Sequence, residues 1–318
     1  MSEIICGDCL QVLPTLPDSS VDLVLTDPPY FKVKGDAWDR QWDKPGQFLL
    51  WLDAVVEQFA RVLKPNGSLY LFASPQMGAR VECQIAARLN VLNRIRWTKS
   101  QGWHQKAQKE ALRSYLSPWE EIIFAEQGYE GVCEPIRAYL ASERDRAGWT
   151  TRRVAEAYQR KTGSRTVTGM AGHWFERVQW TFPTEENYEW LRRLLNSEGG
   201  VYLPLDYKYL RKDYEELRRP FAVTADVPYT DVWDFPTVQA YPGKHPCEKP
   251  QALLRHIITA SSRPGAVVLD AFAGTGSTGM ACKALGREFI GIEMSEAYAA
   301  TARNRIAATD AQSELFAA

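Results

Sequence analysis

The tetrapeptide Asp27-Pro28-Pro29-Tyr30 brings together a carboxylate, a backbone carbonyl and an aromatic ring. An apolar run over residues 21–26 precedes it and is typical of a buried strand, so these groups stand at the carboxyl end of that strand. The two prolines lack N–H donors and restrict the turn, which keeps the Pro28 carbonyl available as an acceptor. Two acceptors beside a flat stacking ring suit a planar amino group. Alone, the four residues also fit an ordinary Asp-Pro turn.

A glycine-rich segment near the other end of the chain indicates a second site. Residues 266–270 have the pattern of a buried strand, and a helix-like stretch to residue 285 follows the glycines. Glycine lets a ligand approach the backbone closely, and the first turn of a helix offers unpaired N–H groups. The next strand-like run ends in a carboxylate placed to accept from ribose hydroxyls. The pattern predicts a nucleoside site whose candidate contacts are Asp270, Phe272, Gly274, Gly276 and Glu293.

The glycines at 274, 276 and 279 also satisfy the spacing G-x-G-x-x-G of dinucleotide-binding proteins. A nicotinamide-dependent oxidoreductase is therefore an alternative, and it predicts a fluorescence change with NADH. That alternative gives residues 27–30 no role.

Together, the two motifs resemble those of the amino-group DNA methyltransferases that use S-adenosylmethionine. Because residues 27–30 precede the glycine loop, the chain is similar to the permuted beta class of this family. The resemblance covers roughly residues 3–126 and 228–307. It implies S-adenosylmethionine as the cofactor, double-stranded DNA as the partner, and a catalytic set made of Asp27, Pro28, Pro29 and Tyr30.

Two further segments fit the resemblance. Asp8 matches a family aspartate near the cofactor adenine. Lys249 lies in residues 245–250, which resemble the H-P-x-x-K-P segment that approaches the amino acid part of the cofactor. A surface turn at Asp8 and a helix-starting proline at Pro250 are the alternatives.

The resemblance implies site-specific methyl transfer to an exocyclic amino group in DNA, more often N6 of adenine than N4 of cytosine. A base inside a duplex is out of reach, so it would be flipped into the site. The Asp27 carboxylate and the Pro28 carbonyl would accept from the amino group while Tyr30 stacks on the ring. Cytosine N4 or an RNA base stays an alternative, although cytosine-specific members more often carry Ser at the position of Asp27. A non-catalytic DNA-binding protein is disfavoured because both motifs are intact.

The composition of the chain is typical of a globular protein without a membrane span. Its 318 residues are 45% hydrophobic and 24% charged, and no apolar run approaches the ~18 residues of a membrane span. We therefore expect a cytoplasmic protein with no membrane partner. The six cysteines are scattered, which argues against a disulfide framework, and no pattern predicts a metal site. The sequence leaves open the DNA recognition sequence, a homodimer and a cognate restriction endonuclease.

Charge is segregated along the chain although the net charge is only -1. Basic residues outnumber acidic ones six to one between Arg94 and Arg113, and eight to three between Arg137 and Arg165. Such basic segments matter more for phosphate binding than the average charge does. Each could also be the solvated face of a helix.

Alternating strand-like and helix-like runs predict an α/β fold with a doubly wound, mostly parallel sheet, as in Rossmann-like methyltransferases. The carboxyl ends of residues 21–26 and 266–269 are expected side by side at a switch point, where open α/β sheets bind ligands. Residues 1–130 and 227–310 would form this domain, residues 131–226 a largely helical insert and residues 311–318 a tail. Strands are predicted at about 3–6, 21–27, 67–73, 91–98, 118–126, 266–271 and 287–293, and helices at about 48–63, 76–90, 250–262, 276–286 and 295–307.

The insert is expected to recognise DNA. A helix capped by a threonine begins near residue 150, a glycine-containing turn follows, and residues 170–180 form a second short helix. A third helix begins at a capping box at Thr184. The first two helices suggest a helix-turn-helix-like module, although a packing role for the insert is the alternative. The candidate DNA contacts in the two basic segments are Lys99, Trp103, His104, Lys106, Arg152, Arg153 and Arg165, and those on the second short helix are His173 and Trp174.

Overall fold

The computed structural model describes residues 2–31, 40–99, 113–128, 133–166, 169–177, 179–223, 230–239, 241 and 247–310. By its internal packing the chain divides into two compact units. We call Met1–Gly128 with Arg219–Ala318 the sheet unit and Tyr129–Arg218 the helical unit. Trp103, His104, Lys106 and the tail predicted at 311–318 lie outside the described residues. Within the described part of the chain, no helix is long and apolar enough to cross a membrane.

One sheet forms the centre of the sheet unit, with the strand order β1-β8-β7-β2-β3-β5-β4-β6. Neighbouring strands run parallel except β5, which is antiparallel to both β3 and β4. This confirms the predicted doubly wound, mostly parallel sheet. Of the described strands, the short β6 was not expected from sequence. The strands are β1 (Ser2–Cys6), β2 (Val21–Thr26), β3 (Leu63–Ala73), β4 (Asn90–Thr98), β5 (Trp119–Glu126), β6 (Val232–Asp234), β7 (Val267–Asp270) and β8 (Glu288–Glu293).

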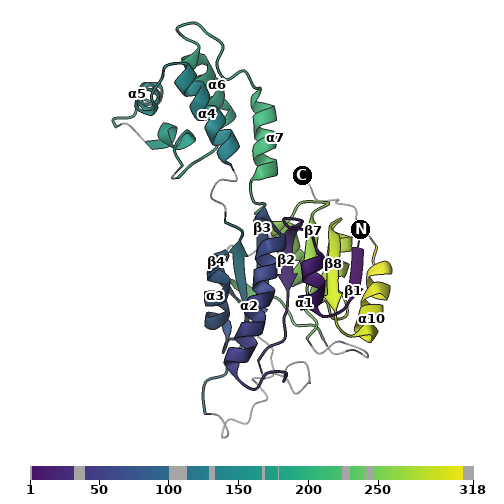
Figure 1. The fold of residues 1–318 in the computed structure, drawn as a ribbon. Coiled ribbons are helices and arrows are strands. Elements are labelled where there is room, and N and C mark those ends of the chain that lie inside the picture. Colours follow the sequence, from purple (N-terminus) through teal and green to yellow (C-terminus); the bar gives the residue numbers. More distant parts are fainter. Residues whose placement is uncertain are drawn as a thin grey trace. The chain divides into compact units, whose positions relative to one another are not determined.

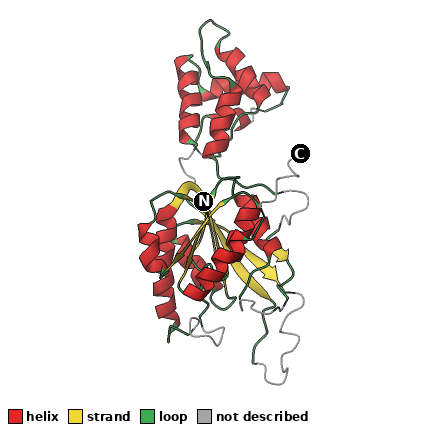
Figure 2. Cartoon of the chain, turned by 90° about the vertical axis from the view of Figure 1, so that its right-hand side faces the viewer, coloured by secondary structure: helices red, strands yellow, loops and turns green. Residues whose placement is uncertain are grey.

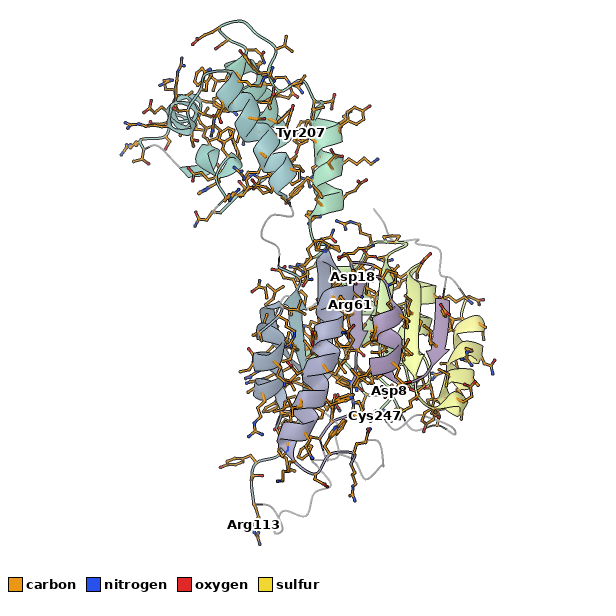
Figure 3. The ribbon with its side chains drawn as sticks, in the orientation of Figure 1. Asp8, Asp18, Arg61, Arg113, Tyr207 and Cys247 are labelled. Carbon is orange, nitrogen blue, oxygen red and sulfur yellow. The ribbon has the colours of Figure 1, made fainter. Side chains whose placement is uncertain are left out.

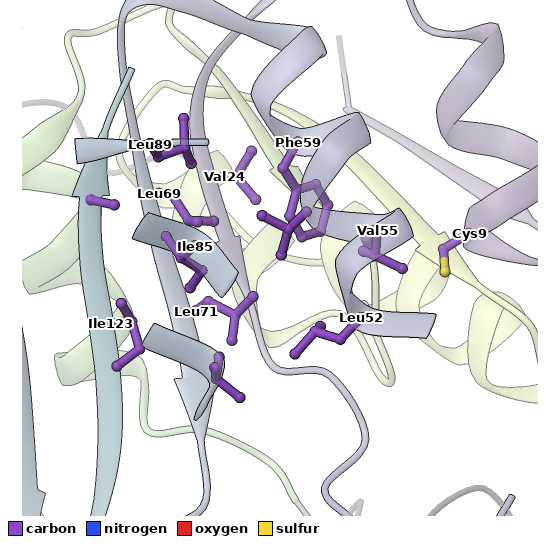
Figure 4. Packing of buried hydrophobic residues seen from close by; sticks show 14 of the residues in the cluster. Cys9, Val24, Leu52, Val55, Phe59, Leu69, Leu71, Ile85, Leu89 and Ile123 are labelled. Atoms are coloured by element: carbon purple, nitrogen blue, oxygen red, sulfur yellow. The ribbon is translucent and has the colours of Figure 1, made fainter. Parts of the chain in front are cut away.

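The central strands are apolar on both faces, which is why their sequences lack a polar side. In β3, Leu69 and Leu71 pack into one hydrophobic cluster, while Tyr70 and Phe72 belong to the cluster on the other face. Strands covered on both faces read as continuous apolar runs. Figure 4 shows Leu69 and Leu71 beside Phe59 of a covering helix. The two clusters hold the sheet between two helical layers.

The helices cover the sheet on both sides, as Figures 1 and 2 show. One layer contains α1 (Cys9–Val12), α2 (Pro45–Val62) and α3 (Gly78–Ala86), whose buried residues join the first cluster. The opposite layer contains α8 (Gln251–Ser261), α9 (Ser277–Ala284) and α10 (Glu296–Ala307), whose buried residues join the second. The apolar faces of these helices therefore account for both cores.

Strands β2 and β7 lie side by side although more than half the chain separates them (Figure 1). Leu23 pairs with Val268 and Val24 with Leu269, in parallel register. The loops after the two strands consequently leave the same edge of the sheet. This confirms the expected switch point, and it places the tetrapeptide beside the glycine loop.

The helical unit has its own hydrophobic core, built around Leu140, Trp174, Tyr188 and Leu195. Thr150 and Thr184 cap α5 and α6 by accepting from backbone N–H groups, as the sequence predicts. The elements are α4 (Glu134–Arg146), α5 (Thr151–Thr162), the 3₁₀ helix η5 (Gly169–Trp174), α6 (Glu185–Leu195) and α7 (Tyr207–Leu217).

The second short helix of the insert differs from its prediction. Instead of a helix over 170–180, the structure has the six-residue η5, and the chain turns directly after it. The N–H groups of Phe175 and Glu176 both donate to the Gly172 carbonyl, which closes that turn. Two glycines within six residues weaken an α-helix, and the burial of Trp174 fixes where the segment ends.

Candidate functional site

The loops after β2 and β7 open onto one cavity of about 380 Å³. Asp27 and Tyr30 line it from the β2 side, and Phe272 lines it from the β7 side. Asp8, which follows β1, and Cys247, which precedes α8, also line it, and Figure 3 shows both toward the same end of the sheet. The two motifs found in the sequence therefore share one hollow at the carboxyl edge of the parallel strands.

Asp27 keeps one carboxylate oxygen without a partner. Its Oδ2 accepts a hydrogen bond from Lys249 Nζ. Its Oδ1 is buried and accepts no hydrogen bond from any residue that the structure describes. A buried acceptor left unsatisfied is costly, so Oδ1 is an acceptor that the donor of a bound ligand would satisfy.

Lys249 lies between two carboxylates. Besides Asp27, its Nζ faces Glu120 Oε2 at 3.5 Å. The resemblance assigns Lys249 to the cofactor's amino acid part, which stays a prediction; in the structure its Nζ pairs with Asp27 and with Glu120 near the start of β5. Glu120 in turn forms an ion pair with Lys99. A row of alternating negative and positive charges thus runs along the cavity wall, formed by Asp27, Lys249, Glu120 and Lys99.

Burial and pairing oppose each other in this cluster. Burial raises the pKa of Asp27 above its ordinary value, although Lys249 partly offsets the effect. Burial alone would raise the pKa of Glu120, but Lys249 and Lys99 hold it below its ordinary value. Burial would lower the pKa of Lys249, but Asp27 and Glu120 raise it above its ordinary value. Lys249 is therefore a fixed cation at neutral pH.

Tyr30 presents an anchored aromatic ring beside Asp27. Its hydroxyl donates to Glu120 Oε2 at 3.3 Å, and Lys249 Nζ lies 5.8 Å from the centre of its ring. Pro28 and Pro29 line the same cavity. The carboxylate, the two prolines and the ring predicted from the tetrapeptide are thus brought together as expected from sequence.

Asp270 organises the glycine loop through internal hydrogen bonds. Its Oδ1 accepts from the Thr26 hydroxyl at 2.8 Å and from the Phe272 N–H at 3.1 Å, and its Oδ2 accepts from the Thr278 hydroxyl at 2.7 Å. Thr26 Oγ1 also accepts from the Ala271 N–H at 3.2 Å. Asp270 therefore links the end of β2 to the loop, which is a supporting role beside the cofactor contact predicted from sequence.

The other predicted cofactor residues surround the same space. Both oxygens of Glu293 accept backbone hydrogen bonds, from Gly274 at 2.9 Å and from Ser295 at 2.8 Å. Asp8 caps α1 by accepting from Leu10 N at 2.9 Å. Carboxylate oxygens have further lone pairs, so both groups can still accept from ligand hydroxyls.

A nucleoside bearing an amino acid fits the residues of this cavity. Its volume is in the range of small-ligand pockets, and apolar Phe272 and Ile292 line it together with the carboxylates of Asp8 and Glu293. Gly274 and Gly276 have φ angles of 53° and 83°, which only glycine adopts without strain. S-Adenosylmethionine is such a ligand.

The buried Asp270 makes stability dependent on pH. Burial raises its pKa from 3.8 to about 6, and the charge of Asp27 adds to the effect. Between pH 3.8 and about 6 the folded state binds more protons at Asp270 than the unfolded state does. The free energy of unfolding therefore falls as the pH rises through this range. Asp270→Asn removes the titration and keeps the shape. From pH 4.5 to 7 the stability of the parent should fall relative to this variant by about 2 kcal/mol.

Urea unfolding of both proteins at the two pH values measures this difference. A difference that stays constant with pH would show that Asp270 does not titrate as its surroundings predict.

The predicted DNA contacts have different surroundings. Lys99 lines the cavity and pairs with Glu120, so it is part of the cavity wall. Arg152, Arg153 and Arg165 are all exposed, and the Arg153 Cζ also lies 4.0 Å from the centre of the Trp149 ring.

The candidates Trp174 and His173 differ in their exposure to solvent. Trp174 is only 1% exposed and packs in the core of the helical unit, so its predicted contact with DNA is wrong for this structure. The neighbouring His173 is partly exposed, and its Nδ1 is buried and accepts or donates no hydrogen bond within the described residues.

Glu120 is a charged residue of the cavity that sequence reasoning missed. It lies in the predicted strand 118–126, and an acidic residue at a strand end was the available signal. Because β5 runs antiparallel to β3, its amino end lies where the parallel strands have their carboxyl ends. The direction of β5 was not readable from the sequence, so this placement was not foreseen.

The sequence of this chain is similar to those of known DNA methyltransferases. The family model described as DNA methylase, for N6 and N4 methyltransferases, matches residues 21–304. DNA adenine methyltransferase YhdJ of Escherichia coli (strain K12) is 31% identical over 299 residues, which cover 93% of this chain and 79% of that protein.

Two solved structures share the fold. The complex of M1.HpyAVI with SAM superposes with a TM-score of 0.54 at 19% identity, covering 96% of this chain and 99% of that one. The cytosine-N4-specific PvuII DNA methyltransferase gives a TM-score of 0.57 at 14% identity, covering 96% of this chain and 86% of that one.

Proposed function

The chain belongs to the DNA methylase family, and from this premise we propose that it is a site-specific enzyme that methylates adenine N6 in duplex DNA with S-adenosylmethionine. Asp27 Oδ1 carries the proposal, because it is a buried acceptor without a donor among the described residues. It belongs to the same cavity as the glycine loop. The E. coli relative is named an adenine methyltransferase, which supports adenine over cytosine.

S-Adenosylmethionine supplies an electrophilic methyl group when bound, and the chain prepares the acceptor. The amino nitrogen of adenine is a poor nucleophile because its lone pair is delocalised into the ring. Hydrogen bonds to Asp27 Oδ1 and to the Pro28 carbonyl favour a tetrahedral nitrogen with a localised lone pair. Tyr30 stacks on the ring and holds it in place. Alignment of this kind is the main task of the site.

The same carboxylate accepts the proton that the amino group loses after methylation. Burial raises the pKa of Asp27, so it binds a proton more readily than an exposed aspartate would. Asp8, Phe272 and Glu293 would hold the cofactor, and the loop at Gly274 and Gly276 would let it approach the backbone. Because the site is a recessed cavity, the base must leave the duplex to enter it.

Methyl transfer to DNA tests the proposal directly. The purified chain is incubated with labelled S-adenosylmethionine and duplex DNA from a methylation-deficient host, and the DNA is digested to nucleosides. We expect label in N6-methyladenine. Label in N4-methylcytosine would support the cytosine alternative instead, and no transfer to DNA would contradict both. Modification-sensitive sequencing of the product gives the recognition sequence.

We infer that the helical unit contributes to DNA recognition. Helix α5 and the segment η5 pack against each other across a turn at Gly163, whose φ of 67° ends the helix. The side chain of Arg152 is 89% exposed on α5, and Arg165 is exposed beyond the turn. Exposed arginines at a helix-turn unit are suited to phosphate contacts. Whether the chain forms a homodimer or acts with a restriction endonuclease stays open.

Replacing both Arg152 and Arg165 by glutamine should weaken duplex binding and reduce its salt dependence. Each lost phosphate contact lowers the log-log slope of affinity against salt by about one, so we expect a decrease of about two. Lys212→Gln, at an exposed side chain on α7, is the control for charge removed from the same unit. An unchanged slope with a lowered melting temperature would indicate that these arginines serve packing instead.

A further inference from the structure

The residue Glu120 contacts both groups that flank the proposed amino-group site. Its Oε2 lies 3.5 Å from Lys249 Nζ, the cation that holds Asp27, and it accepts from the Tyr30 hydroxyl at 3.3 Å. Its Oε1 pairs with Lys99. One carboxylate on β5 is thus joined to the carboxylate after β2 and to the stacking ring.

We propose that Glu120 is a positioning residue for methyl transfer, which holds Lys249 and Tyr30 so that Asp27 Oδ1 and the aromatic ring stay in place for the base. The proposal rests on the proposed function and adds a residue to its machinery. Lys249 occupies Asp27 Oδ2, so it fixes the rotation of the carboxylate and leaves Oδ1 as the free oxygen. The Tyr30 hydroxyl donates to Glu120 and also interacts with Asp27, so Glu120 contributes to fixing the ring.

The charge balance of the cluster gives Glu120 a second effect. Positive charge develops on the amino nitrogen as the methyl group transfers, and a negative carboxylate beside it is stabilising. Lys249 alone would neutralise Asp27 and cancel that stabilisation. Glu120 shares the positive charge of Lys249, so less of that charge offsets the ionised Asp27 carboxylate where it faces the base. Lys99 pairs with the outer oxygen of Glu120 and keeps that carboxylate ionised inside the protein.

Glu120→Gln removes the charge and keeps the size of the side chain. We expect its single-turnover methylation rate to fall by about 10²-fold, as for other preorganised electrostatic groups, with S-adenosylmethionine affinity within about twofold of the parent. Glu121→Gln is the matched control. Glu121 is the next residue of the same strand, is buried, pairs with Arg94 and does not line the cavity. Its rate should stay within about threefold of the parent.

The pH profile separates positioning from a purely structural role. Among the described residues, Asp27 is faced by Glu120, Lys249 and Tyr30, and the titratable groups Asp270, Cys247 and Lys99 also lie around this cluster. The Glu120 charge raises the pKa of Asp27. Without it the acid limb of the rate profile should move to lower pH while the plateau falls. A loss of packing alone would lower the plateau and leave the limb in place.

Tyr30→Phe provides a second variant, because it keeps the ring and removes only the hydroxyl that Glu120 holds. We expect a loss of about tenfold in single-turnover rate with the melting temperature unchanged. Parent-like rates for both Glu120→Gln and Tyr30→Phe, with the acid limb unmoved, would overturn the proposal. The parent is assayed alongside, and its failure to methylate adenine would instead refute the proposed function.

Discussion

Replacing Asp27 by alanine is expected to abolish methyl transfer while S-adenosylmethionine still binds. The change removes the buried acceptor Oδ1, and among the described residues it leaves Glu120 as the ion-pair partner of Lys249. Loss of one preorganised group of this kind lowers turnover by about 10²–10³-fold, and the amino group also loses its proton acceptor. Cofactor affinity should stay within about twofold, since the glycine loop is untouched. Labelled-methyl transfer and calorimetry measure the two quantities.

Asp27→Asn distinguishes charge from shape. Lys249 is a cation and donates, so the amide must turn its oxygen to Lys249 and its NH₂ toward the base. Two donor groups would then face each other at the reacting nitrogen. We therefore expect the asparagine variant to be almost as inactive as the alanine variant. An asparagine variant with more than about a tenth of parental turnover would contradict the assignment of Asp27 as the acceptor.

The sheet and its switch point could be predicted because their signals are local. Strands buried on both faces give unbroken apolar runs, and the prolines and glycines after β2 and β7 mark where those strands end. Both motifs then had to meet, since parallel strands present their carboxyl ends at one edge. The predicted ends at about residues 27 and 271 lie one residue beyond those of β2 and β7, because the turn residues there allow little continuation.

Features that depend on long-range pairing could not be predicted. No local sequence pattern indicates that β5 runs antiparallel to β3, and this direction is what brings Glu120 to the cavity. The contact between Lys249 and Asp27 joins residues 222 positions apart, so spacing could not reveal it. Trp174 was a candidate DNA contact because it lies on the predicted second short helix of the insert, but it packs in the core of the helical unit with residues of α5 and α6. Burial of an aromatic residue is decided by packing that only the folded unit provides.

Gly276→Ala is expected to abolish tight S-adenosylmethionine binding. Gly276 has a φ of 83°, and an added Cβ would lie 2.9 Å from the Ala302 Cβ and 3.0 Å from its Cα. The left-handed conformation costs an alanine about 1–2 kcal/mol, and the clash with α10 adds to it. The loop must therefore move away from its position between β7 and α9. Because this loop lines the cavity, cofactor affinity should fall by about 10²-fold or more.

Gly286→Ala is the matched control for this effect. Gly286 has a φ of 68°, but an added Cβ would meet nothing within 4 Å, and the residue does not line the cavity. It therefore carries the conformational cost without the clash, which predicts a stability loss of about 1 kcal/mol and parental cofactor affinity. Calorimetry with S-adenosylmethionine beside a urea unfolding curve measures both quantities for each variant. If Gly276→Ala bound the cofactor as Gly286→Ala does, the glycine loop would not be the cofactor site, and the cavity would have to be assigned to the base alone.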